Sequence, residues 1–197
     1  MDEDKIEFIP GGGVTTPKGF YAGAAIARIK AQAEPHLDLG ILRAEVPCTA
    51  AAVFTTNKVQ AAPVILSRRR LEKGRAVAVV ANSGCANACT GEQGIADLKE
   101  ITRLVAGKLG IVPEDVLMAS TGVIGQTLPV ELIKTSIPLV NLSRESGHDF
   151  ARAIMTTDRI NKEVAVSVVA GGERFTIGGA AKGSGMIHPD MATMLCF

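Results

Sequence analysis

The chain is short of aromatic residues and of excess charge, and both shortages limit what it can bind. Tryptophan is absent, there is one tyrosine among 197 residues, and aromatic side chains make up 4% of the sequence. Proteins that hold single-stranded nucleic acid stack its bases on aromatic rings, and duplex binders carry a clustered positive excess. Lysine and arginine number 21 against 20 aspartate and glutamate residues, so we expect no nucleic-acid partner.

Long apolar runs and paired cysteines are also lacking. No run approaches the ~20 residues of a membrane span, and residues 1–5 are acidic where a signal or transit peptide would be basic. The four cysteines are too sparse for a disulfide framework, and Cys85 and Cys89 lack a second pair at zinc-finger spacing. We therefore expect a cytoplasmic protein with reduced thiols, no membrane partner and no metal.

One basic run interrupts the even charge. Arg68, Arg69 and Arg70 are followed closely by Lys73 and Arg75. Such a run either forms the solvated end of a helix or binds a polyanion, and the balanced charge of the whole chain favours the helix end.

Small aliphatic residues and glycine dominate the composition. Hydrophobic residues reach 47% and glycines number 21, which predicts one domain over residues 1–197 with an aliphatic core. Short β-branched runs bounded by turn residues predict strands at Thr49–Thr55, Arg75–Ala81, Val116–Ser120, Glu163–Val169 and Arg174–Ile177. Apolar spacing of three or four residues predicts a helix at Glu92–Leu109, and weaker helices are expected at Ala62–Lys73, Pro129–Ser136 and Ser143–Thr156. Strands mixed with helices indicate an α/β fold, with mixed sheets layered with helices.

The helix expected at Glu92–Leu109 has the clearest end signals. Thr90 and Gln93 have the spacing of a capping box at its start. Gly110 follows its last apolar residue and can close it in the left-handed conformation.

Two glycine-rich segments resemble phosphate loops only superficially. In Gly178–Gly183 the lysine precedes the last glycine, whereas a phosphate loop needs Gly-Lys followed by serine or threonine. After Gly183-Ser-Gly185 the third glycine of a dinucleotide fingerprint is absent. Close backbone approach or a tight turn explains these glycines without a nucleotide.

Three polar segments have compositions too specific for ordinary turns. Residues 82–91 lie between a strand and the clearest helix, where they either hold a ligand on backbone amides or only cap the helix. Thr121 and Gly122 end a strand, where a hydroxyl and an N–H aimed at one point can form an oxyanion hole. Met155-Thr-Thr-Asp158 sits at the expected end of a helix, where its hydroxyls either cap that helix or face a substrate, with capping slightly favoured.

The most informative stretch is Lys182–Phe197, which places a hydroxyl beside a small residue at Ala192-Thr193. A threonine hydroxyl is a poor nucleophile at its own pKa and needs a base. One solution is to cut the chain before the threonine, so that its freed amine does that work. The Ala192-Thr193 bond therefore fits a self-cleavage site.

Histidines offer little to a competing serine hydrolase. His36, His148 and His188 are the three in the sequence, and no Gly-x-Ser-x-Gly elbow accompanies them. His188 lies five residues before Thr193, where it either tunes the nucleophile or belongs to a turn at Pro189.

Together these motifs resemble the ornithine acetyltransferase family of arginine biosynthesis. The resemblance spans essentially the whole chain, and its motifs are long and occur in order. They are Gly13-Val-Thr-Thr-Pro-Lys-Gly-Phe20, Val53-Phe-Thr-Thr-Asn57, Ala61-Ala-Pro-Val64, Asn82-Ser-Gly with Ala86-Asn-Ala-Cys-Thr-Gly91, Ser120-Thr-Gly-Val-Ile-Gly125, Met155-Thr-Thr-Asp158 and Lys182-Gly-Ser-Gly-Met-Ile-His-Pro-Asp-Met-Ala-Thr-Met-Leu195.

The resemblance implies an acetyl transfer. In the family, the threonine matching Thr193 takes an acetyl group from N2-acetylornithine and passes it to glutamate, giving ornithine and N-acetylglutamate. The residues matching Thr121 and Gly122 form the oxyanion hole, and those matching Thr156, Lys182 and Thr193 contact substrate. No cofactor is implied, although some members also accept acetyl-coenzyme A.

The resemblance also implies processing. The precursor cuts itself between Ala192 and Thr193 into an α chain, here residues 1–192, and a β chain, of which residues 193–197 are the start. The two chains stay associated as an α2β2 heterotetramer. They share an N-terminal-nucleophile-like fold that is incomplete without the β chain, so we expect the isolated chain to be inactive and to expose apolar surface.

Two other functions remain open. A related self-processing aminopeptidase or hydrolase of the same fold would pass the acyl group to water instead of glutamate. Alternatively, the chain is a non-catalytic binding fragment. Acetyl transfer to glutamate distinguishes the transferase from the hydrolase, and cleavage before Thr193 distinguishes both enzymes from the binding fragment.

Overall fold

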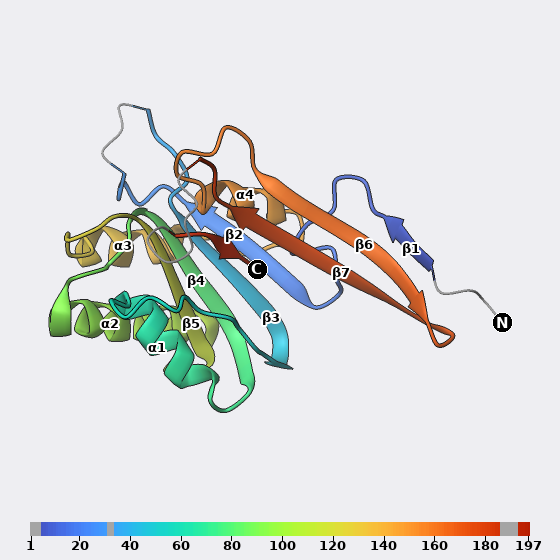
Figure 1. Cartoon of the computed structure of the whole chain (residues 1–197), viewed down its shortest axis with the longest axis horizontal. Coiled ribbons are helices and arrows are strands. Elements are labelled where there is room, and N and C mark those ends of the chain that lie inside the picture. The colour runs from blue at the N-terminus through green and yellow to red at the C-terminus, as the bar shows by residue number, and fades with distance from the viewer. Residues whose placement is uncertain (1–4, 31–33, 186–192) are drawn as a thin grey trace.

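Two four-stranded sheets form the framework of the protein (Figure 1). The computed structural model describes residues 5–30, 34–185 and 193–197. The first sheet has the order β2-β3-β4-β5, formed by Phe20–Ala25, Leu39–Thr49, Arg75–Cys85 and Val116–Val123. The second has the order β1-β6-β7-β8, formed by Lys5–Phe8, Lys162–Ala170, Glu173–Lys182 and Leu195–Cys196. Among these described strands, β4 and β5 are the one parallel pair.

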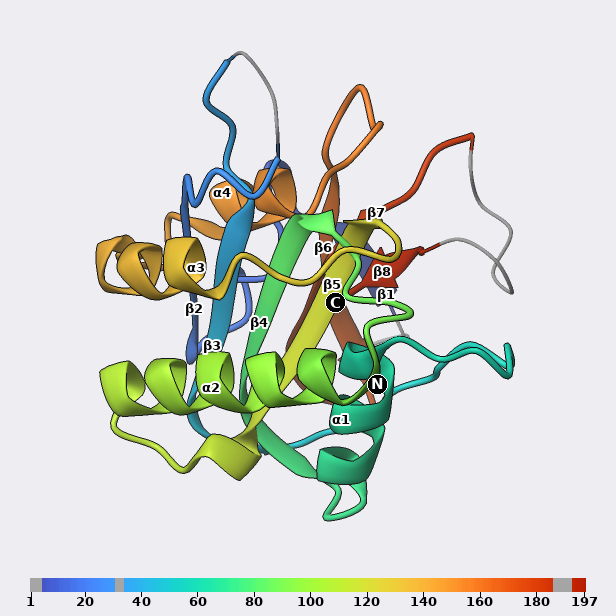
Figure 2. The same cartoon turned by 90° about the vertical axis from the view of Figure 1, so that its left-hand side faces the viewer.

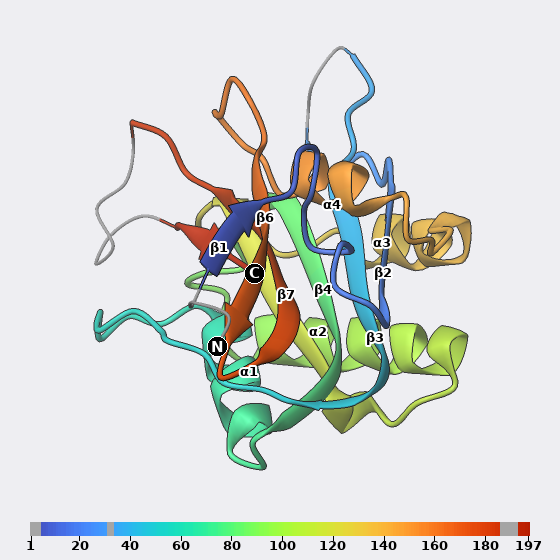
Figure 3. The same cartoon turned by 90° about the vertical axis from the view of Figure 1, so that its right-hand side faces the viewer.

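Helices cover one face of the first sheet, and the second sheet lies towards its other face. The helix-covered face carries α1 (Ala62–Leu71), α2 (Gly91–Leu109) and α3 (Val130–Ser136), with the 3-10 turns Pro113–Asp115 and Ile137–Leu139 (Figure 2). Helix α4 (Gly147–Ala153) packs against β2 and β3 on the side of the second sheet (Figure 3). The arrangement confirms the predicted α/β fold with mixed sheets and layered helices.

The larger core lies between the first sheet and α2. Leu98, Ile101 and Val105 are fully buried along one face of the helix, as their spacing predicts. Full burial of each such side chain contributes about 1.5–3 kcal/mol. Gly110 ends the helix at φ 68° in the left-handed conformation, which confirms the predicted C-terminal signal.

The predicted capping box at the start of α2 is wrong. The Thr90 side chain makes no capping hydrogen bond to the helix. Its hydroxyl donates instead to Asn87 Oδ1 at 2.6 Å, and Gln93 Nε2 donates to Asp97 Oδ1 at 2.7 Å. A hydrogen bond between two of its own side chains therefore holds the loop before the helix. The first residues of segment 82–91 belong to β4.

The basic run ends α1, but it is only partly solvated. Arg70 is buried, and its guanidinium donates to the backbone carbonyl of Val116 at the start of β5. Lys73 and Arg75 both pair with the buried Asp115, at 3.1 and 2.9 Å. The prediction of a solvated helix end is thus incomplete, because Arg70 binds the first residue of a core strand and Lys73 and Arg75 pair with the aspartate just before it.

One predicted strand, Thr49–Thr55, is wrong. Strand β3 ends at Thr49, and the residues beyond it reach solvent, with Val53 99% exposed. β-branched residues favour a strand only where a partner strand and a packed face exist.

Other boundaries differ less. Strands β1 and β2 escaped prediction because they are short, and most of β3 because glycine, proline and charged residues interrupt its apolar pattern. Helix α4 begins at Gly147 and ends at Ala153, inside the predicted Ser143–Thr156. The remaining predicted strands and helices are present with ends shifted by a few residues.

The outer face of the second sheet is apolar and exposed. Strand register groups on this face the side chains of Ile6, Phe8, Val164, Val166, Val168, Phe175 and Ile177. Ile6 is 68% exposed and Phe8 77%. A contiguous exposed apolar surface is uncommon on a protein that acts alone, and it agrees with the expected exposure of apolar surface.

Several features are absent from the described part of the chain. Its cysteines are free thiols, of which Cys85 is buried and Cys89 and Cys196 are exposed. Residues 5–30, 34–185 and 193–197 contain no group of three or more His, Cys, Asp or Glu side chains placed to hold a metal ion. Over the same ranges, no helix combines the length and apolarity needed to cross a membrane.

Candidate active site

The parallel strands β4 and β5 end side by side and carry the predicted oxyanion-hole residues. Register pairs Ser83 with Thr121 and Gly84 with Gly122. Gly122 lies at φ 136°, and a Cβ there would sit 2.3 Å from the carbonyl carbon of Gly84, so only glycine fits this close approach. In α/β proteins, ligands bind beyond the carboxyl ends of parallel strands, which is where this pair lies.

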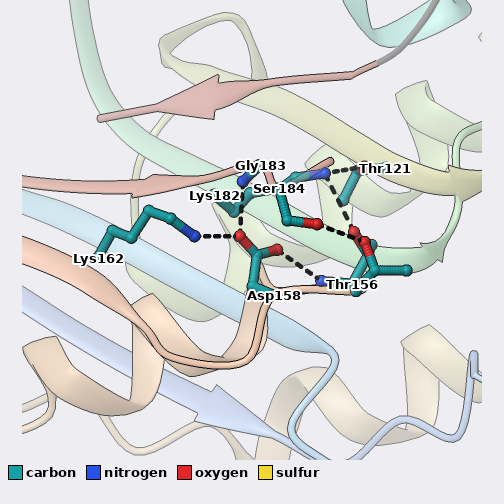
Figure 4. A network of polar contacts seen from close by, with 8 residues as sticks. Thr121, Thr156, Asp158, Lys162, Lys182, Gly183 and Ser184 are labelled. Atoms are coloured by element: carbon teal, nitrogen blue, oxygen red, sulfur yellow. Dashed lines mark hydrogen bonds and ion pairs between the residues drawn. The ribbon is translucent and has the colours of Figure 1, made fainter. Parts of the chain in front are cut away.

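Lys182 joins the second sheet to this strand end (Figure 4). Its Nζ donates to Thr121 Oγ1 at 2.9 Å and to Thr156 Oγ1 at 3.3 Å. Lys182 is 4% exposed and Thr121 2%. Burial lowers the pKa of Lys182, while the negative charge of Asp158 acts to raise it. The structure thus brings three predicted site residues together at one ammonium group.

Asp158 anchors the segment that carries Thr156 (Figure 4). Its side chain is 0% exposed and pairs with Lys162 Nζ of β6. It also accepts hydrogen bonds from the backbone N–H of Gly183 at 2.8 Å and of Thr156 at 3.3 Å. Burial alone would raise the pKa of the carboxyl, but the bonds from Lys162, Gly183 and Thr156 outweigh it and hold the pKa at about 2. Asp158 is therefore charged at neutral pH.

The hydroxyls that follow α4 do not cap it. The helix ends at Ala153, and the Thr156 hydroxyl binds Lys182 instead. Thr157 Oγ1 lies 2.9 Å from Ser184 Oγ, just beyond β7. The slightly favoured capping interpretation is wrong, because this segment turns towards the second sheet.

Two charged residues of the site escaped the reasoning from sequence. Asp158 stood in the Thr-Thr-Asp motif but received no role. Lys30 donates its Nζ to the carbonyl of Met155 at 2.8 Å, across 125 positions of sequence. Burial lowers its pKa, and Asp38 and Asp158 oppose that effect. No local pattern around Lys30 could have indicated this contact, whereas the position of Asp158 in a distinctive motif was a usable signal.

The residues after the predicted cleavage site are part of the fold. Register pairs Leu195 of β8 with Lys182 of β7, so Thr193 lies two residues ahead of the partner of Lys182. Phe197 exchanges backbone hydrogen bonds with Ala180. Its ring meets that of Phe150 edge to face, with centroids 5.2 Å apart. Thr193 is partly buried, while Ala192 and His188 lie outside the described residues.

The glycines ahead of Lys182 serve close packing. Gly178 lies in β7, and a Cβ there would sit 2.1 Å from the carbonyl oxygen of Gly13. This confirms close backbone approach as the reason for glycine at this position.

A separate polar cavity of about 420 Å³ lies beside the start of α4. Thr15, Arg144, His148 and Glu163 are among its lining residues, and His148 Nδ1 lies 2.5 Å from Glu163 Oε1. None of the described site residues, Thr121, Gly122, Thr156, Lys182 and Thr193, lines it. Thr121, Gly122, Thr156 and Lys182 lie elsewhere, at the ends of β4, β5 and β7.

Residues 21–197 match the model of the ArgJ family. The chain is 54% identical over 99% of its length to the arginine biosynthesis bifunctional protein ArgJ of Dehalococcoides mccartyi. It is 44% identical over its whole length to the protein of the same name from Bacillus subtilis. In both cases it covers 48% of the relative, so it spans about half the length of the curated relatives it matches.

Two solved structures share this fold. The crystal structure of the arginine biosynthesis bifunctional protein ArgJ from Bacillus halodurans aligns with a TM-score of 0.89 at 38% identity, covering 98% of this chain and 100% of that one. The ornithine acetyltransferase from Mycobacterium tuberculosis, solved with ornithine, aligns with a TM-score of 0.86 at 38% identity, covering 97% and 100%. The resemblance thus extends from sequence to three-dimensional structure.

Proposed function

The chain belongs to the ArgJ family, and from this membership we propose that it forms the first half of an enzyme that transfers acetyl groups from N2-acetylornithine to glutamate. The meeting of Thr121, Thr156 and Lys182 at the ends of β4, β5 and β7 carries the proposal. The related ornithine acetyltransferase solved with ornithine supports the choice of substrate.

The proposed enzyme consists of two chains, produced by cleavage between Ala192 and Thr193. This chain covers about half of the curated relatives but 100% of both solved chains, which supports a division of the relatives near this point. After cleavage, the pairing of β8 with β7 and the contact of Phe197 with Phe150 would keep the new chain start in place. The α and β chains therefore stay associated, and two such pairs form an α2β2 heterotetramer.

The second half has a surface to cover. The exposed apolar face of β1, β6 and β7 belongs to the same sheet as β8, with which the second chain would begin. Burying that face would contribute about 25 cal/mol per Å² of apolar area removed from water. Without the second half, the chain is expected to be inactive and to self-associate.

Acetylation of the enzyme begins at Thr193. Its freed α-amine, with a reference pKa of about 8, accepts the proton of the hydroxyl as Oγ attacks the acetyl carbonyl of acetylornithine. The resulting oxyanion accepts hydrogen bonds from the Thr121 hydroxyl and the Gly122 N–H. Collapse of the intermediate breaks the amide bond, and the departing ornithine amine takes the proton. The product is an acetyl ester on Thr193.

Transfer to glutamate reverses these steps. The neutral amine of glutamate attacks the acetyl ester, and the oxyanion forms again at the same donors. The ester bond breaks, the Thr193 oxygen regains a proton from the attacking amine, and N-acetylglutamate leaves. A covalent intermediate of this kind predicts ping-pong kinetics.

Lys182 has a donor left for substrate. An ammonium group has three N–H donors, and two of those of Lys182 bind threonine hydroxyls. The third serves a substrate carboxylate, next to Thr156. The reaction needs no metal or resident cofactor, and acetyl-coenzyme A is a second possible acetyl donor at the same threonine.

Self-cleavage uses the same nucleophile. Thr193 Oγ attacks the carbonyl of Ala192, and the acyl group moves from nitrogen to oxygen. Water then hydrolyses the ester, which leaves Ala192 with a carboxylate and Thr193 with a free amine. Before this step the amine is locked in a peptide bond and cannot act as a base.

The test uses the full-length precursor that contains this sequence, with Thr193→Ala as the matched variant. Mass spectrometry of the parent should show two chains divided before Thr193, and the variant should stay uncut. The purified parent should convert acetylornithine to ornithine in a glutamate-dependent reaction, and the variant should show no transfer. A Thr193→Ala protein that still yields two chains would refute the assignment.

The same assay separates the alternatives. Free acetate formed equally well without glutamate would indicate the self-processing hydrolase. An uncut precursor with neither transfer nor hydrolysis would indicate the binding fragment.

A further inference from the structure

Asp158 is a buried carboxylate in the site without a role in the acetyl-transfer scheme. We infer that Asp158 is a positioning residue: it keeps Lys182 charged, and thereby keeps the Thr121 hydroxyl hydrogen directed at the acetyl oxygen. The inference rests on the proposed transferase function, and nothing in the comparisons with relatives assigns this residue.

Asp158 holds two backbone segments of the site at once. The Asp158 carboxylate accepts the N–H of Thr156 with one oxygen and the N–H of Gly183 with the other, at 3.3 and 2.8 Å. Thr156 binds the Lys182 ammonium, and Gly183 follows Lys182 in the chain. One side chain therefore ties both segments that place the lysine head group, and its complete burial keeps these bonds out of competition with water.

Asp158 also lies among several positive charges. Among the described residues, three lysines gather here from separate parts of the chain: Lys30 after β2, Lys162 in β6 and Lys182 in β7. Burial lowers the pKa of Lys182, and the charges of Lys162 and Lys30 lower it further. Asp158 is the one described group whose charge acts in the opposite direction on Lys182, while Asp38 acts on Lys30.

The charge of Lys182 fixes the direction of its hydrogen bond with Thr121. A charged ammonium can only donate, so Thr121 Oγ1 must accept from Lys182, which leaves its own hydrogen free for another acceptor. A neutral lysine amine gains a lone pair and can accept that hydrogen. The hydroxyl would then point at the lysine instead of the oxyanion. The charge of Lys182 thus decides whether Thr121 can act as an oxyanion donor.

Activity depends on pH through the Thr193 amine and the Lys182 ammonium. Activity rises as the Thr193 amine loses its proton and falls again when Lys182 loses its own. Asp158 raises the pKa of Lys182, so Asp158→Asn should move the alkaline decline to lower pH. A nearby opposite charge typically moves a pKa by about 1–3 pH units. At pH values above both midpoints, the variant should be about tenfold less active than the parent for every pH unit that separates the two midpoints.

The experiment measures acetyl transfer from pH 6 to 10, with the processed parent and Asp158→Asn enzymes. Substrate ionisations are the same for both proteins, so any difference between the profiles comes from the enzyme. The expected result is an alkaline limb displaced to lower pH by about one pH unit or more. At alkaline pH, kcat should change by a larger factor than KM. A uniform loss of activity at every pH would overturn the inference, since a merely structural role gives that result.

A second variant covers the case in which Asp158→Asn does not fold. Lys162 is partly exposed and repels Lys182, so Lys162→Gln should move the alkaline limb in the opposite direction, to higher pH. An unchanged limb, or one moved to lower pH, would contradict the inference. Failure of the parent enzyme to transfer acetyl groups would instead count against the proposed function, which keeps the two tests separate.

Discussion

A buried cation and a threonine hydroxyl meet at each end of strand β5, but the two pairs are bonded differently. At its start, Arg70 binds the carbonyl of Val116 and, at 3.0 Å, the hydroxyl of Thr102. That hydroxyl in turn donates to the carbonyl of Leu98 at 2.8 Å. At the far end of the strand, Lys182 binds the hydroxyls of Thr121 and a second threonine. Both ends thus hold a buried cation on a threonine oxygen.

The difference lies in the hydrogen that each threonine keeps. Thr102 gives its hydrogen to a helix carbonyl, so the network at the start of β5 is complete within the fold. Thr121 accepts from Lys182, and within the described part of the chain its hydroxyl donates to no protein group. A saturated network stabilises structure, whereas a hydroxyl with its hydrogen in reserve can bind a developing charge. The comparison indicates where substitutions will cost stability and where they will cost rate.

The largest effect is expected at the end of β5 that carries Thr121. Thr121→Val keeps the shape of the side chain but removes the proposed oxyanion donor, so kcat should fall about 10²- to 10³-fold. Thr121→Ser, which restores the hydroxyl, should recover most of that loss. The measurement is steady-state acetyl transfer by the processed enzyme. A valine variant with the parental kcat would remove Thr121 from the oxyanion hole.

At the start of β5, substitution of Arg70 should change the stability of the protein and not its rate. Arg70→Met removes two hydrogen bonds from a charged donor, each worth about 1.5–3 kcal/mol, while sparing the burial of a charge. The free energy of unfolding of the full-length protein should fall by about 2–3 kcal/mol, as measured by denaturant titration. The kcat of the folded enzyme should be unchanged. Arg70→Lys should be intermediate in stability, and a loss of kcat on substitution by methionine would erase the contrast between the two ends.

The same contrast explains how much of the protein the sequence could predict. Arg75–Ala81 and Val116–Ser120 read as strands because uninterrupted apolar residues fill core strands, and the Thr-Gly pair at the end of β5 was visible as a motif. The predicted strand at Thr49–Thr55 was wrong because the β-branched side chain of Val53 has no partner strand in the structure. Local pattern therefore identified buried elements and failed where only a tertiary contact decides the conformation.

The candidate site shows the same limit. The family resemblance of their motifs predicted a shared site for Thr121, Thr156 and Lys182, and the structure places the three within hydrogen-bonding distance. Lys30 could not, because its contact with Met155 spans 125 positions and depends on how the segment after β2 crosses the strand ends. The burial of Arg70 was missed for the same reason, since nothing in a run of three arginines tells which one points into the core.

The smallest predicted effect comes from the partly exposed cations at each end. The side chains of Arg75 and Lys162 are 52% and 43% exposed, and each pairs with a buried aspartate. Such pairs contribute at most about 1 kcal/mol, so Arg75→Gln and Lys162→Gln should each lower the free energy of unfolding by no more than that, and less at high salt. Arg75→Gln should leave the pH profile of acetyl transfer unchanged, because Asp115 remains paired with Lys73 and lies at the start of β5, where Arg70 binds. Equal displacement of the profile by both substitutions would mean that net charge, and not the local network around Lys182, sets the alkaline limb.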